Sequence, residues 1–133
     1  MQGDQDFQKL IKSMKPILNE GEYVFCTLTQ IDSIPYNEII NYFREEEGIS
    51  IILPRHSADK LNLKYTYIAG WITLTVHSSL DVVGLTAFFS KALTDAKISC
   101  NVVAAYYHDH IFVPIRDAQR ALEVLYQLSK TEF

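Results

Sequence analysis

The second half of the chain alternates strand and helix patterns in an order that few folds accommodate. Residues 71–76 alternate apolar and polar side chains, which predicts a half-buried strand. A stripe of apolar residues at helical spacing follows, formed by Val82, Leu85, Phe89, Leu93 and Ala96. Residues 98–107 and 111–115 are predicted strands joined by a tight turn at residues 108–109, and Asp117 is placed to cap a last helix. The predicted order is strand, helix, strand, strand, helix.

This order lacks one strand of a ferredoxin-like sheet, and few residues follow the last helix. An open sheet edge invites aggregation, so we expect the missing strand to come from elsewhere in the chain. Residues 22–28 (EYVFCTL) are rich in β-branched and aromatic side chains and are the best candidate. We therefore predict an α+β, ferredoxin-like sandwich of two interlocked modules with mostly antiparallel sheets, in which residues 22–28 pair with strands of the second half.

The first half opens with a predicted amphipathic helix over residues 6–14, which Pro16 ends. Residues 19–21 (NEG) predict a turn before the following strand. Residues 36–47 are ambiguous, because they fit either a helical stripe or a strand that enters a hairpin. Ser57 is placed to cap a short helix after that segment.

Composition limits the functions open to the chain. Hydrophobic residues make up 48% of its 133 residues, enough for a core, and a net charge of -4 argues against binding nucleic acid. No apolar run is long enough to span a membrane, and the polar, acidic start predicts no signal peptide. Cys26 and Cys100 lie inside predicted strands, which favours buried thiols in a reducing cytoplasm over a disulfide.

An Asp-x-x-Gly turn at Asp81–Gly84 leads from a predicted strand into the amphipathic helix, and the next strand follows Ala96-Lys97-Ile98. This arrangement resembles an ACT domain, although Val83 and Lys97 stand where the common pattern has Pro and Gly. The whole chain resembles a group of small bacterial proteins of unknown function with paired ACT-like modules. The segments that carry this wider resemblance are residues 21–27, 43–48, 77–80 and 106–113.

The resemblance implies two modules, an N-terminal ACT-like module over residues 1–68 and an ACT domain over residues 69–133. Their fold would be similar to that of aspartokinase regulatory regions and eukaryotic arginine sensors. It also favours the hairpin over the helix for residues 36–47, with a turn at residues 46–48 and a returning strand at 49–53.

The strand-to-helix turn at residues 78–84 is the strongest candidate for a ligand site. A helix N-terminus offers unpaired N–H groups and a positive dipole to a carboxylate, and Gly84 leaves room for a ligand to approach. The resemblance implies that the ligand is an amino acid bound at this turn. The predicted ligand-binding residues are Ser78, Ser79, Asp81, Val83, Gly84 and Asn101. The alternative is a purely structural turn, in which Ser78 and Asp81 cap the helix and Gly84 packs against a strand.

Metal and catalytic chemistry find less support in the sequence. His108, Asp109 and His110, with His77, form the one metal-like cluster, but no third ligand stands at a diagnostic spacing. We therefore expect neither a metal nor a cofactor. None of the common catalytic or nucleotide-binding motifs is present, so we predict no catalytic residues and no enzyme activity.

These observations predict a regulatory or sensor protein that binds a small molecule, by resemblance an amino acid. We expect a homodimer or a higher homo-oligomer, joined by sheet edges or adjacent helices. The alternative is a protein-interaction or oligomerisation module without a ligand, because exposed sheet edges pair readily.

Overall fold

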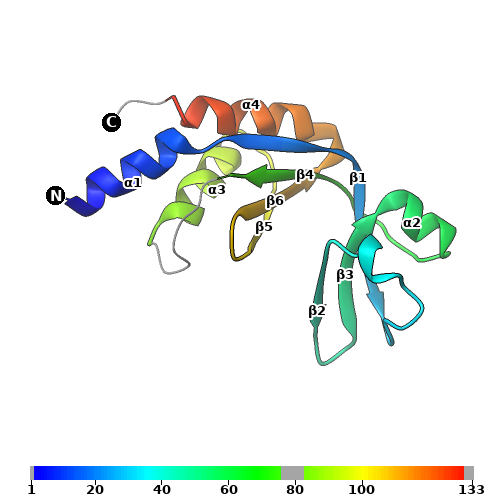
Figure 1. The fold of residues 1–133 in the computed structure, drawn as a ribbon. Helices are drawn as coiled ribbons and strands as arrows, with labels where there is room; N and C mark the ends of the chain where they lie inside the picture. The colour runs from blue at the N-terminus through cyan, green and yellow to red at the C-terminus, as the bar shows by residue number, and fades with distance from the viewer. Residues whose placement is uncertain (1, 76–82, 131–133) are drawn as a thin grey trace. The chain divides into compact units, whose positions relative to one another are not determined.

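The computed structural model describes residues 2–75 and 83–130, without the side chains of residues 2–6 (Figure 1). Its helices and strands, in chain order, are α1 (Gln2–Ser13), β1 (Pro16–Leu28), the 3-10 helix η1 (Tyr36–Glu38), β2 (Asn41–Arg44), β3 (Ile49–Pro54), α2 (Arg55–Lys60), β4 (Ile68–Leu74), α3 (Leu85–Asp95), β5 (Asn101–Ala104), β6 (Asp109–Pro114), the 3-10 helix η2 (Ile115–Asp117) and α4 (Ala118–Leu128). The hydrogen-bonded strand order is β2-β3-β1-β4-β6-β5. The α+β, ferredoxin-like fold predicted from the sequence is confirmed.

The chain divides into two compact units. The large unit comprises Met1–Asn19 and Gly70–Phe133, and the small unit comprises Glu20–Ala69. Strand β1 belongs to both, since it begins in the large unit and continues into the small one. The N-terminal segment therefore groups with the second half of the sequence.

In the large unit, apolar side chains from α1, α3 and α4 pack against alternate residues of β4 and β6. The buried residues of this core are Ile11, Met14, Ile72, Leu74, Leu85, Phe89, Leu93, Ile98, Ile111, Val113, Ala118, Ala121 and Leu125. Strand β4 passes so close to α4 that a Cβ added to Gly70 would lie 2.7 Å from the Cβ of Ala118. Only glycine fits this approach without displacing the helix.

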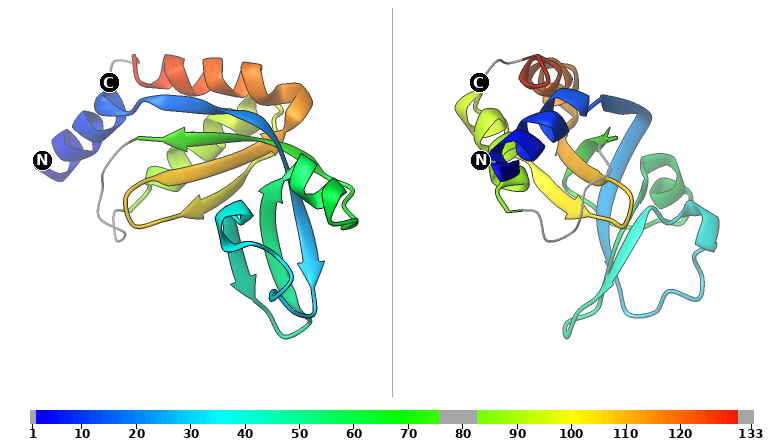
Figure 2. Two further views of the ribbon diagram at one scale, coloured as in Figure 1. Left: turned by 45° about the vertical axis from the view of Figure 1, so that its right-hand side comes forward. Right: turned by 60° about the vertical axis from the view of Figure 1, so that its left-hand side comes forward.

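In the small unit, the β2–β3 hairpin and the second part of β1 form one antiparallel sheet (Figure 2). The register pairs Val24 with Leu53 and Cys26 with Ile51. The buried residues of this core are Val24, Cys26, Ile34, Ile51, Leu53 and Ala58. Since Ala58 comes from α2, this short helix covers the face of the sheet that carries Val24 and Cys26.

The hairpin preferred for residues 36–47 is confirmed, after a single 3-10 turn at Tyr36–Glu38. Its turn closes through two backbone bonds, Glu45 N–H to Gly48 O at 2.9 Å and Gly48 N–H to Glu45 O at 3.3 Å. These bonds close a hairpin with a two-residue loop, which agrees with the predicted turn at residues 46–48.

Strand β1, which contains the segment 22–28 expected to link the two halves, is hydrogen-bonded to β3 on one side and to β4 on the other. Residues 23–28 pair with β3, inside the first half. Near the start of the same strand, the Asn19 side chain donates to Trp71 O, and Thr75 N–H donates to Lys15 O at 3.0 Å. The predicted turn at residues 19–21 was wrong, because Gly21 takes φ 107° within a continuous β1.

Two predicted helix caps were wrong. Helix α2 begins at Arg55 with no side-chain cap, and the Ser57 hydroxyl donates to Glu38 Oε1 at 3.0 Å. Asp117 does precede α4, but its carboxylate accepts a bond from Arg120 Nη2 at 3.2 Å instead of capping the helix. Ser57 cannot cap α2 because it is the third residue of the helix, whereas the Asp117 carboxylate is drawn to Arg120. The proposed cap formed by Ser78 and Asp81 lies outside the described residues.

The second predicted strand of the second half, residues 98–107, is shorter than expected. Strand β5 covers only Asn101–Ala104, because α3 continues to Asp95 and Lys97 then takes a positive φ of 63°. The Ala105 N–H donates to His108 O at 3.0 Å, so the hairpin turn lies at residues 106–107 and not at residues 108–109. Asp109 and His110 are consequently residues of β6.

Candidate functional site

The predicted turn site is described only in part. Ser78, Ser79 and Asp81 lie outside the described residues. Val83 is 90% exposed, and Gly84 precedes α3 with φ 91°; no atom of the residues described here lies within 4 Å of the position its Cβ would occupy. Gly84 therefore packs against none of the described strands. Its left-handed conformation and the open space beside it give this glycine a conformational role.

Asn101, the sixth predicted residue, begins β5 and is exposed opposite Phe112 of β6. Among the residues that the structure describes, no hydrogen bond joins Asn101 to Val83 or Gly84. The structure thus leaves Val83, Gly84 and Asn101 accessible.

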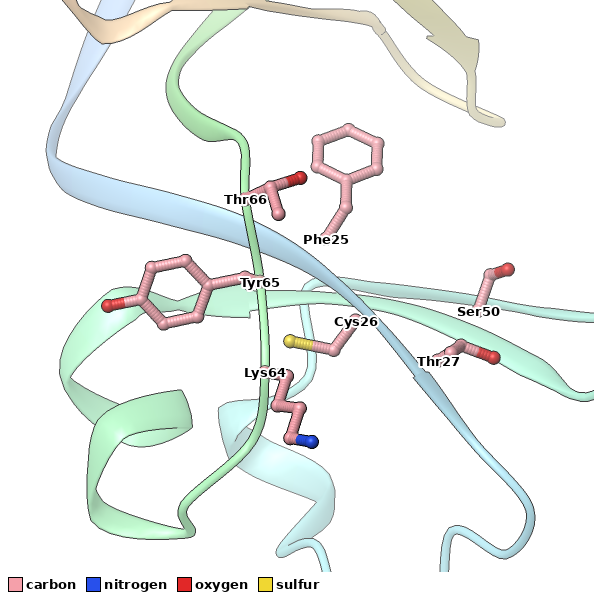
Figure 3. Close-up of a pocket in the computed structure, with 7 residues that line it drawn as sticks. All are labelled: Phe25, Cys26, Thr27, Ser50, Lys64, Tyr65 and Thr66. Atoms are coloured by element: carbon pink, nitrogen blue, oxygen red, sulfur yellow. The ribbon is translucent and has the colours of Figure 1, made fainter.

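A pocket that the sequence did not predict lies within the small unit (Figure 3). Its volume is about 390 Å³, and its lining residues come from β1, β3 and the coil before β4. They are Phe25, Cys26, Thr27, Ser50, Lys64, Tyr65 and Thr66. Because residues 64–66 follow α2 with neither strand nor helix periodicity, the sequence carried no signal that would have placed them beside β1.

The pocket combines one cation with hydroxyl groups and aromatic surface. Lys64 is exposed and has no acidic partner within ion-pair distance among the described residues. The Tyr65 hydroxyl is already engaged, since it accepts from Arg55 Nε at 2.9 Å and donates to Asp59 Oδ1 at 2.6 Å. These two hydrogen bonds hold the Tyr65 side chain in place, so its ring forms a fixed wall of the pocket.

The remaining lining groups suit binding better than catalysis. The Ser50 hydroxyl donates to the Glu45 carboxylate at one end of the pocket. Burial raises the pKa of the Cys26 thiol, which keeps it protonated and weakly nucleophilic near neutral pH. A cation beside hydroxyls and aromatic rings favours a small ligand with an anionic group and an apolar body.

A second polar arrangement lies in the large unit and engages His110, one member of the predicted histidine cluster, whereas His77 lies outside the described residues. The Trp71 indole Nε1–H donates to His110 Nδ1 at 3.0 Å, and Thr73 Oγ1 lies 3.3 Å from the same nitrogen. The Asn19 amide donates to Thr73 Oγ1 at 2.9 Å and to Trp71 O at 3.1 Å. Since indole can only donate, His110 must accept at Nδ1 and carry its proton on Nε2.

The surroundings of His110 favour the neutral form of its ring. Burial, and secondarily the neighbouring His108, lowers the pKa of His110, which agrees with a neutral ring held by a donor. Burial raises the pKa of Asp109. Within the described part of the chain, no three His, Cys, Asp or Glu side chains are grouped closely enough to hold a metal ion.

Comparison with known proteins assigns both halves of the chain to one family. Residues 2–70 and residues 67–127 each match a family model described as an ACT domain. A solved structure of a Vibrio cholerae protein of unknown function, described as a possible transport protein, is 42% identical with a TM-score of 0.85 and covers 96% of this chain and 98% of its own.

More distant structures share the fold. An Agrobacterium tumefaciens protein is 17% identical with a TM-score of 0.64, over 87% of this chain and 89% of its own. The regulatory subunit of aspartate kinase from Thermus thermophilus is 7% identical with a TM-score of 0.58, over 85% of this chain and 95% of its own. No curated protein matches the sequence. None of the described helices has both the length and the apolar character needed to cross a membrane.

Proposed function

We propose that this chain, which belongs to the ACT-domain family, is a cytoplasmic regulatory protein that binds an amino acid and does not catalyse a reaction. The observation that carries the proposal is the match of both halves of the chain to ACT domains, which are regulatory ligand-binding modules. The two matches also support a division into modules over residues 1–68 and 69–133. The fold shared with an aspartate kinase regulatory subunit is consistent with this role.

The proposed binding residues are those of the strand-to-helix turn, Ser78, Ser79, Asp81, Val83, Gly84 and Asn101. Two features support them: Val83 and Gly84 stand open at the start of an eleven-residue helix, and Asn101 is exposed on β5. Unpaired N–H groups of α3 would receive the ligand carboxylate, and Asp81 would hold its ammonium group.

The pocket of the small unit is the second place where the same ligand class fits. Lys64 would face a carboxylate there, and Phe25 and Tyr65 would contact an apolar side chain. Substitutions at the turn and in the pocket should change the ligand affinity differently, depending on which location binds the amino acid. Titration calorimetry with an amino acid can therefore tell the two locations apart.

The first comparison uses wild type and two variants of the turn. Asp81→Ala should weaken binding several-fold, because a charged contact at a helix terminus contributes about 1 kcal/mol. Gly84→Asn should weaken it further by filling the open space, and asparagine tolerates a positive φ better than other non-glycine residues. Unchanged affinity in both variants would remove the turn from the proposal.

Lys64→Met then tests the pocket, with Lys60→Met on α2 as a matched control that removes an equal charge outside it. Loss of binding in Lys64→Met alone would place the ligand in the small unit. Absence of binding by any amino acid to wild type would favour the alternative function, an interaction or oligomerisation module. That alternative has its own support in the exposed aromatic residues Tyr36, Tyr42 and Phe43.

The proposed assembly is a homodimer or a higher homo-oligomer. ACT domains often associate with one another, and β2 and β5 end the strand order of the described residues, each with one side that no described strand pairs with.

A further inference from the structure

The lining of the small-unit pocket carries an unbalanced charge. Lys64 is its one cation, and none of its seven described lining residues is acidic. Across residues 2–75 and 83–130, Lys64 forms neither an ion pair nor a side-chain hydrogen bond. A ligand in this pocket therefore meets one positive charge and no lining group of the opposite sign.

Two carboxylates contact the lining from outside the pocket, and both are already engaged. Asp59 accepts from the Tyr65 hydroxyl at 2.6 Å, and its other oxygen lies 3.9 Å from Arg55 Nε. Glu45 accepts from the Ser50 hydroxyl. Neither carboxylate lines the pocket. The pocket consequently offers hydroxyl oxygens, and not a carboxylate, to an ammonium group.

The Cys26 thiol leaves this charge balance unchanged. In Figure 3 the thiol points from β1 toward the coil that carries Lys64 and Tyr65. Burial raises the pKa of the thiol, so it stays protonated near neutral pH. A thiolate at this position would compete with an anionic ligand for Lys64, whereas the neutral thiol leaves the cation to the ligand.

The apolar walls of the pocket are held by neighbouring groups. The Phe25 ring contacts the edge of Tyr67, with ring centroids 5.6 Å apart and an interplanar angle of 69°. The Tyr65 ring is held through its hydroxyl by Arg55 and Asp59. The volume of about 390 Å³ is near the lower end of the roughly 300–1,000 Å³ usual for ligand pockets. These walls therefore suit a small apolar body.

The single cation distinguishes between two kinds of carboxylic acid. In an amino acid the ammonium and carboxylate groups share one carbon atom, so a carboxylate at Lys64 brings a second ammonium close to the first. Like charges about 4 Å apart repel each other in water, and more strongly at a partly buried site. A carboxylic acid without an ammonium group makes the same contact with Lys64 and avoids this repulsion.

We propose that the pocket binds an apolar monocarboxylate that lacks an ammonium group, such as a 2-oxo acid or an aryl-substituted carboxylic acid, in preference to the corresponding amino acid. This inference goes beyond the proposed function, because it adds a second ligand class at a second location. It leaves the turn at residues 78–84, where Asp81 would hold an ammonium group, as the place for the amino acid.

Titration calorimetry with probes that share one apolar body tests the inference. They are 3-phenylpropanoate, with a carboxylate alone, 2-phenylethylamine, with an ammonium group alone, and phenylalanine, with both. Acetate supplies the charge without the apolar body. In wild type, 3-phenylpropanoate should bind at least about tenfold more tightly than phenylalanine binds in the pocket. Neither acetate nor 2-phenylethylamine should give measurable binding.

Substitution of the lysine assigns the binding to the pocket. Lys64→Met should weaken 3-phenylpropanoate about tenfold or more, because it removes the charged hydrogen-bond donor. Lys60→Met on α2, outside the lining, is the matched control and should leave the affinity unchanged. Phenylalanine binding that persists in Lys64→Met occurs outside the pocket and supports the inference.

A third variant reverses the preference. Thr66 is an exposed lining residue on the same coil as Lys64. Thr66→Asp supplies the missing acidic group, so the ratio of the affinities for 3-phenylpropanoate and phenylalanine should shift toward phenylalanine by about tenfold. Thr66→Asn, of nearly the same size and without the charge, should keep the wild-type ratio.

The remaining outcomes contradict one proposal or the other. Absence of 3-phenylpropanoate binding to wild type, or equal affinity in Lys64→Met, would overturn the inference. Phenylalanine that binds wild type as tightly as 3-phenylpropanoate and is lost in Lys64→Met would also overturn it, because the amino acid would then occupy the pocket. Binding of 3-phenylpropanoate with no amino acid bound anywhere would support the inference and overturn the proposed function alone.

Discussion

The two units of this chain differ in how fully they cover their sheets. In the large unit, α1, α3 and α4 all contribute to a core in which thirteen of the described residues are buried. In the small unit, α2 supplies one residue to a core of six. The small unit also carries the pocket at Lys64 and the exposed edge of β2. We infer that the large unit provides most of the stability, whereas the small unit keeps more surface available for binding.

Matched core substitutions should reveal this difference, and they have the largest effects we expect. Leu93 of the large unit and Leu53 of the small unit are both 0% exposed. Truncation of a buried leucine to alanine costs about 2–5 kcal/mol, depending on how well the surroundings collapse. We expect Leu93→Ala near the upper end, because helices and strands enclose that side chain, and Leu53→Ala near the lower end.

Urea unfolding followed by circular dichroism measures both costs. Equal costs would mean that the sparse core of the small unit is as constrained as that of the large one. A larger cost for Leu53→Ala would reverse the comparison.

A smaller change in stability should follow from disrupting the polar network around His110, which belongs to the large unit. Trp71→Phe removes the donor to His110 Nδ1, so it should cost about 1 kcal/mol at pH 7.5. Burial lowers the pKa of His110 below its ordinary 6.5, so the unfolded chain takes up this proton first as the pH falls. Its contribution to stability is therefore complete above pH 6.5 and lost as the pH falls through the lower, folded value.

The difference in stability between wild type and Trp71→Phe should shrink over that window, because protonated His110 can no longer accept the indole bond. Asp109 has a raised pKa and acts in the opposite sense, losing stability as the pH rises through its folded value. Since it is present in both proteins, Asp109 cancels from the comparison. A difference that stays constant from pH 7.5 to pH 5 would contradict the assigned tautomer.

The sequence predicted the elements with strong periodicity and missed those defined by distant contacts. Helix α3 and the alternation of β4 followed from local apolar spacing. The continuation of β1 through Gly21 did not, because one glycine can either end a strand or bend it. The side chains of Ser57 and Asp117 bond to Glu38 and Arg120, and no local pattern distinguishes that choice from a helix cap.

The candidate sites show the same limit. The Asp-x-x-Gly turn ending at Gly84 was predicted from the sequence, whereas the apolar stripe was begun too early, at Val82, because α3 starts only at Leu85. The pocket was not predictable, because Lys64 and Tyr65 reach Phe25 only through the tertiary fold. His110 was predicted only as part of a metal-like cluster with its sequence neighbours, whereas its bond to Trp71 spans 39 residues and required the sheet register to be known.

The central claim is that this protein binds an amino acid, and a thermal-shift screen of the twenty amino acids against the wild type tests it most directly. A ligand that binds only the native state raises the melting temperature by mass action. The account predicts that one amino acid, or a few of related chemistry, will raise the melting temperature in a saturable, concentration-dependent way. Unchanged melting temperatures for all twenty at millimolar concentration would contradict it.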